Sequence, residues 1–123
     1  MTRRLELLQW FGFSGAALAW AVQLVSGFWV THALCNPSPI GSATSNDASQ
    51  LGLMVAALAV ALAAQGAAAA VFLRTSPSDD DYPPPNGRLH FLAAAALVAN
   101  VLFIVGIVLS GVASSAGDFC RQA

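Results

Sequence analysis

Lysine is absent from this sequence, and charge of either sign is scarce. The five basic residues are all arginine, the acidic residues number six, and charged residues make up 9% of the chain. A soluble domain carries about 25% charged residues, so this chain cannot cover a water-facing surface. The formal net charge of −1 also excludes a basic nucleic-acid binder, whose signature is a strong positive patch.

The sequence is instead rich in long hydrophobic runs. Hydrophobic residues make up 57% of the 123 positions, and the runs 10–32, 50–73 and 89–112 contain no Asp, Glu, Lys or Arg. Runs of 23 or 24 residues are long enough to cross a hydrocarbon core about 30 Å thick at about 1.5 Å per helical residue. Backbone groups in lipid must bond within their own segment, so these runs are predicted to be helices. We therefore expect an all-α membrane protein, with residues 1–123 forming a single membrane domain of three transmembrane helices.

The arginine positions predict the orientation of these helices. Two arginines precede the first run, two flank the second connection between runs, and one lies on the other side: Arg3, Arg4, Arg74, Arg88 and Arg121. Cytoplasmic loops carry an excess of Arg and Lys. The N-terminus is therefore expected inside and the C-terminus outside. The expected location of this multi-pass protein is the bacterial inner (cytoplasmic) membrane.

Small and polar residues indicate how the helices pack. One face of the first run combines small residues with Trp and Gln, at spacings of 4, 4, 3 and 4: Gly12, Ala16, Trp20, Gln23 and Gly27. Small residues on such a face allow two helices to approach closely. Gly106 and Ser110 have the same small-xxx-small spacing on the third run.

Two amides lie near the middles of their runs. Gln23 and Asn100 are predicted to lie at similar depths, where their side chains can bond across helices and contribute about 0.6–2 kcal/mol. Intramembrane polar residues also mark functional sites, so contact with a quinone or a haem propionate is the alternative interpretation.

The cysteines and histidines lie at the ends of the runs. Cys35 follows the first run and Cys120 follows the third. Both are predicted to lie outside, where an oxidising periplasm favours a disulfide between them; two free thiols are the alternative. His32 is expected at the outer face of the membrane and His90 at the inner face, about 30 Å apart. One haem therefore cannot be held by both. With no nucleophile–base pair and no metal-ligand cluster, we expect no catalytic or metal site and no cofactor bound by the chain alone.

The two outer runs resemble a known family. The segment Gly15-Ala-Ala-Leu-Ala19-Trp20-Ala-Val-Gln23-Leu-Val-Ser-Gly27, followed by Cys35, resembles the first helix of small bacterial three-helix membrane proteins. The third run resembles the same family in Arg88-Leu-His-Phe91-Leu92, Asn100-Val-Leu102-Phe103, Gly111 and Cys120-Arg-Gln. These proteins are encoded beside subunits of cytochrome c oxidase, a haem-copper terminal oxidase. The resemblance does not extend to the second run, and it implies an oxidase context rather than a mechanism.

The leading hypothesis is a non-catalytic accessory or assembly subunit of a bacterial respiratory complex. Cytochrome c oxidase is the first candidate for this complex. Its partners would be the lipid bilayer and larger integral membrane subunits, with no nucleic acid. One alternative is a membrane anchor that contributes to a quinone or haem site with a partner subunit. The other is a small self-associating transporter or channel, although transporters usually carry an intramembrane charge or broken helices.

Overall fold

Three long helices make up the described part of the protein. A computed structural model describes residues 2–35, 43–75 and 86–116, and every one of these residues is helical. Helix α1 spans Thr2–Cys35, α2 spans Ala43–Thr75 and α3 spans Asn86–Ala116. Each contains a segment long and apolar enough to cross a membrane: Arg3–Ala33, Ala48–Thr75 and Gly87–Ser115. The prediction of an all-α protein with three transmembrane helices is confirmed to this extent.

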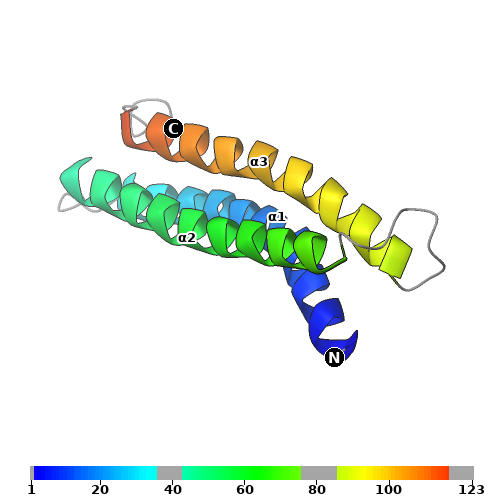
Figure 1. The fold of residues 1–123 in the computed structure, drawn as a ribbon. Coiled ribbons are helices and arrows are strands. Elements are labelled where there is room, and N and C mark those ends of the chain that lie inside the picture. The colour runs from blue at the N-terminus through cyan, green and yellow to red at the C-terminus, as the bar shows by residue number, and fades with distance from the viewer. Residues whose placement is uncertain (1, 36–42, 76–85, 117–123) are drawn as a thin grey trace.

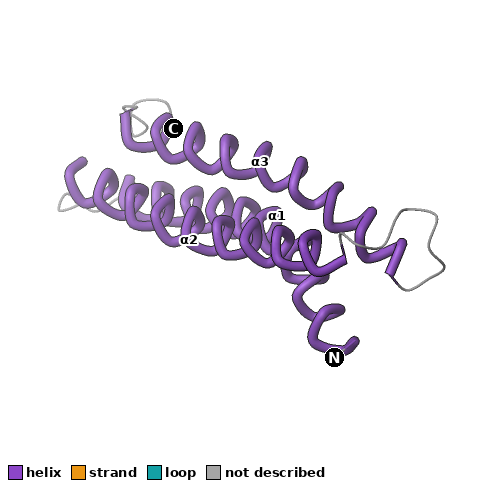
Figure 2. The backbone as a smooth tube through the Cα atoms, viewed as in Figure 1, coloured by secondary structure: helices purple, strands orange, loops and turns teal. Residues whose placement is uncertain are grey.

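The helices run up, down and up in one bundle. Figure 1 shows that the N-terminal end of α1, the C-terminal end of α2 and the start of α3 share one end of the bundle, which we call the N-terminal end. The same path is visible in the backbone tube of Figure 2. Which end faces the cytoplasm stays a prediction.

Each helix extends beyond the charge-free run inside it. Helix α1 begins at Thr2 rather than near residue 10 and includes Arg3 and Arg4, both exposed. A charged residue marks the edge of the hydrocarbon layer, but the backbone hydrogen bonds of a helix continue into the wet interface. The charge-free length therefore predicted the membrane spans but underestimated the lengths of the helices.

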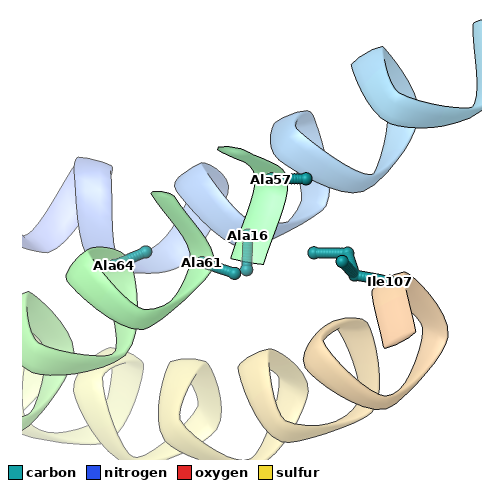
Figure 3. Close-up of a cluster of buried hydrophobic side chains, with 5 residues drawn as sticks. All are labelled: Ala16, Ala57, Ala61, Ala64 and Ile107. Atoms are coloured by element: carbon teal, nitrogen blue, oxygen red, sulfur yellow. The ribbon is translucent and has the colours of Figure 1, made fainter. Parts of the chain in front are cut away.

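The interior of the bundle is built from small side chains. Figure 3 shows the central cluster, in which alanines of α1 and α2 meet a single isoleucine of α3: Ala16, Ala57, Ala61, Ala64 and Ile107. Trp20 and Phe103 pack against this cluster, with ring centroids 5.7 Å apart. A second cluster, Val71, Leu89 and Ala93, lies near the N-terminal end.

Large apolar side chains point outward. Trp10, Phe28, Trp29 and Leu102 are each 65–70% exposed. A contiguous apolar surface of this kind is unfavourable in water and suits lipid or another membrane protein.

Gly12 marks the closest approach of α1 to α2. A Cβ added there would lie 2.9 Å from the backbone N of Ala68 and 3.1 Å from its Cα. These are backbone atoms that cannot turn aside as a flexible side chain can. A Cβ added at Gly66, in contrast, would have no heavy atom within 4 Å.

We predict that Gly12→Ala destabilises the bundle and that Gly66→Ala does not. Both changes add the same methyl group and the same helix propensity, so the difference isolates packing, where overfilling a contact costs about 1–3 kcal/mol. Unfolding of the purified protein by SDS in mild detergent, followed by circular dichroism, measures the difference. Equal stabilities of the two variants would contradict the close contact at Gly12.

Candidate functional site

Two buried amides connect α1 to α3. Asn100 is fully buried, and its Nδ2 donates a hydrogen bond to the Gly12 carbonyl at 2.8 Å. The Gln23 Nε2 donates to the Ile107 carbonyl at 3.2 Å. Both bonds end on main-chain oxygens, which have a second lone pair after making the helical hydrogen bond.

The predicted contact between these two amides is wrong. Gln23 lies level with Ile107, seven residues along α3 from Asn100, which corresponds to about 10 Å of helix. Gln23 Oε1 and Asn100 Oδ1 are buried without a hydrogen-bond partner. Gly12 has no side chain over its carbonyl, so that oxygen is open to the Asn100 amide.

The remaining helix pairs are joined in the same way. Gln50 is buried at the start of the α2 span, and its Nε2 donates to the Gly27 carbonyl at 3.0 Å and to Thr31 Oγ1 at 2.9 Å. The Gln65 Nε2 donates to the Leu97 carbonyl at 3.4 Å. Together with the bonds of α3 to α1, these amides tie each helix to both others. Sequence reasoning gave Gln50 no role, because a polar residue at the end of a run is usually a solvated helix end.

The α1 stripe packs within the chain; by this name we mean the face of α1 that carries Gly12, Ala16, Trp20, Gln23 and Gly27. Gly12, Ala16, Gln23 and Gly27 are buried and Trp20 is half-buried. On α3, Gly106 and Ser110 are half-buried, and a Cβ added to Gly106 would lie 3.3 Å from Trp20 Nε1. The stripe is therefore occupied by α2 and α3 and is not open to another protein.

The two histidines lie at opposite ends of the bundle. His90 Nδ1 is 3.1 Å from Thr75 Oγ1, and the ring stacks on Phe72 with centroids 4.4 Å apart. His32 is exposed and stacks on Phe28 at 6.1 Å. Within residues 2–35, 43–75 and 86–116, no group of three or more His, Cys, Asp or Glu could hold a metal ion.

The expected disulfide falls outside the described residues. Cys120 lies beyond α3, and the side chain of Cys35 is also outside the described part. The Cys35–Cys120 bridge stays a prediction.

An apolar groove runs along the outside of α1 and α2. Its volume is about 370 Å³. Small residues, including Gly15, Ala19 and Ala57, contribute to its lining together with the larger Leu18 and Val22. We call this the α1–α2 groove. A surface that alternates small and large apolar residues has the shape that receives the ridge of another helix.

A polar crevice lies toward the end of the bundle that is opposite to the N-terminal end. It has a volume of about 220 Å³, and its lining includes the buried Gln23 and Gln50, the half-buried Ser110 and Ser114, and the ring of Phe28. These side chains are uncharged and offer amide and hydroxyl groups. The crevice suits a neutral molecule that forms hydrogen bonds.

Fold and contacts together define a three-helix bundle of the membrane-spanning class, closed by small-residue packing and amide-to-carbonyl bonds. Comparison with known proteins identifies no relative: no family model matches the chain, and no curated protein or solved structure is significantly similar to it. The family resemblance is therefore carried only by the residues quoted under "Sequence analysis".

We predict that Asn100→Leu destabilises the bundle more than Gln65→Leu. The Asn100 bond is 2.8 Å long and fully buried, whereas the Gln65 bond is 3.4 Å long and half-buried. Loss of an interhelical hydrogen bond in a membrane protein costs about 0.6–2 kcal/mol, and Asn100→Leu should lie in that range. The same SDS titration ranks the two variants, and an equal or larger cost for Gln65→Leu would contradict this order.

Proposed function

We propose that this chain is a non-catalytic accessory subunit of a bacterial respiratory complex, with cytochrome c oxidase as the first candidate. Its role would be to pack in the membrane against larger subunits and to support their assembly. The oxidase context rests on the residues of the two outer runs that resemble the oxidase-linked family. The bacterial inner membrane is the location that this context implies.

The observation that carries the proposal is the α1–α2 groove. The α1 stripe and most of the intramembrane amides bind the helices of this chain to one another, so they are not available to a partner. The groove, in contrast, is open and almost wholly apolar, with Gly15 and Ala19 at helical spacing along it. It would receive a transmembrane helix of a larger subunit.

We also propose that the N-terminal end of the bundle faces the cytoplasm, because four of the five arginines lie at that side. Reporter fusions at residue 80 should then be active only as a cytoplasmic reporter, and fusions at residues 42 and 123 only as a periplasmic one. A periplasmic signal from residue 80 would reverse the orientation.

The groove predicts a matched pair of variants. Ala56 is exposed in the groove lining, and Ala95 is exposed on α3. Ala56→Trp should fill the groove and lower recovery of the partner subunits about tenfold, the change expected when a contact worth about 1.4 kcal/mol is lost. Ala95→Trp should leave recovery unchanged. Purification of the tagged chain from its native membrane in mild detergent, followed by identification of the bound subunits, measures both.

The same preparation tests the oxidase assignment separately from the accessory role. If the bound subunits belong to another complex, the oxidase assignment is wrong and the accessory role stands. Equal losses from Ala56→Trp and Ala95→Trp would remove the groove from the argument.

A membrane anchor that shares a quinone or haem site with a partner is the second candidate, favoured by the polar crevice. Quinone carbonyls accept hydrogen bonds of the kind that Ser110 and Ser114 offer, and Phe28 provides an apolar face beside them. Extraction of quinone and an absorption spectrum of the purified complex test this candidate. A quinone that is retained by the wild type and lost with Ser110→Val would favour it over the accessory role.

A further inference from the structure

Gln9 differs from the other buried amides of the bundle. The residue is 4% exposed, and both its Nε2 and its Oε1 are buried without a hydrogen-bond partner. Gln23, Gln65 and Asn100 each leave only an oxygen unpaired. An amide that loses its water and gains no hydrogen bond is costly, and such a group in a folded protein calls for an explanation.

Gln9 lines a cavity between α1 and α3. The volume of this cavity is about 400 Å³. Figure 1 shows that the first turns of α1 point away from the start of α3, and residues of both segments line the cavity. Gln9 thus borders a space large enough for part of a ligand.

The lining of the cavity changes from charged to apolar. Glu6 and Arg88 are exposed and lie just beyond the charge-free runs, at the level expected for lipid head groups. Trp10 follows, and Trp favours the membrane interface. Phe13 and Leu92 continue the lining one helical turn further into the spans. A matching ligand therefore has a positive and a negative group at one end and an apolar chain at the other.

We propose that this cavity binds one molecule of an ethanolamine phospholipid from the surrounding leaflet. The Arg88 guanidinium would hold the phosphate through charge-assisted hydrogen bonds, and the Glu6 carboxylate would accept from the ammonium group. The acyl chain would lie along Phe13 and Leu92. This inference requires only the membrane-spanning fold and is independent of the proposed function.

Gln9 supplies the hydrogen bonds that select this head group. Its two amide atoms are covered in the structure and have no hydrogen-bond partner, so a rotation of the side chain into the cavity would break no hydrogen bond. Nε2 then donates to a phosphate or ester oxygen, and Oε1 accepts from an ammonium N–H. A choline head group has no N–H to offer to Oε1 or to Glu6. A phosphatidylglycerol has no cation, and its net negative charge is repelled by Glu6.

The test is native mass spectrometry of the delipidated, full-length protein, titrated with phosphatidylethanolamine, phosphatidylcholine or phosphatidylglycerol of the same acyl chains. Phosphatidylethanolamine should form a one-to-one adduct at about tenfold lower concentration than the other two, the ratio expected for one charge-assisted hydrogen bond. Glu6→Gln should lower the preference over phosphatidylcholine, and Arg88→Gln should weaken the phosphatidylethanolamine and phosphatidylcholine adducts alike. Arg74 is an exposed arginine at the same end of the bundle. Arg74→Gln should change neither the lipid preference nor the strength of the adducts.

Gln9→Leu separates binding from folding. It should lose the phosphatidylethanolamine adduct while keeping or raising the thermal stability of the lipid-free protein, because it removes two unpaired polar atoms. Equal adducts with all three lipids, wild-type binding by Gln9→Leu, or no adduct at all would each overturn the proposal. A lipid-free Gln9→Leu protein that is less stable than the wild type would also overturn it, because the amide would then already be bonded.

Discussion

Helices in a membrane gain nothing by hiding apolar side chains from lipid, because lipid chains are as apolar as leucine. Association must come from close van der Waals packing and from hydrogen bonds between helices. This constraint explains why the central cluster of the bundle consists of alanines, with Ile107 as its only bulky member. It also explains why Trp29 and Leu102 point outward. Small residues bring the backbones together, and large ones give up nothing by remaining in lipid.

Close approach in turn makes the amide bonds possible. Asn100 reaches the Gly12 carbonyl because no side chain on α1 stands between them, and Gln50 reaches the Gly27 carbonyl in the same way. A main-chain carbonyl accepts the extra bond without giving up its helical one, so the helices are tied together at no cost to their own ladders. The glycines therefore serve two purposes, as contact points and as open acceptors. A methyl group at Gly27 would lie 2.8 Å from Gln50 Oε1, so filling one of these positions also disturbs the amide that bonds there.

The three spans could be predicted from the sequence because charge-free length is a one-dimensional property. The α1 stripe could also be predicted, since residues at helical spacing share a face whatever lies opposite. The sequence did not predict which residues of two neighbouring helices lie at the same depth. Depth counted from the middle of each run paired Gln23 with Asn100, whereas the bond of Gln23 to the Ile107 carbonyl sets α3 about two turns away from that register. Gln9 and Gln50 were missed because each stands at the end of a run, where a polar residue is ordinary.

Because the interior is occupied by the chain's own contacts, a partner must act on the outer surface, and α1 presents two different outer surfaces. Glu6, Gln9 and Phe13 share one face of the helix and line the lipid-matched cavity; Phe11, Gly15 and Leu18 share another and line the groove. Two positions along a helix correspond to a rotation of about 200°, so positions 9 and 11 lie on nearly opposite sides. A protein helix seated in the groove would therefore leave the cavity open to lipid. Such an arrangement would suit the proposed role of a subunit at the edge of a larger complex, with one side against protein and the other against the bilayer.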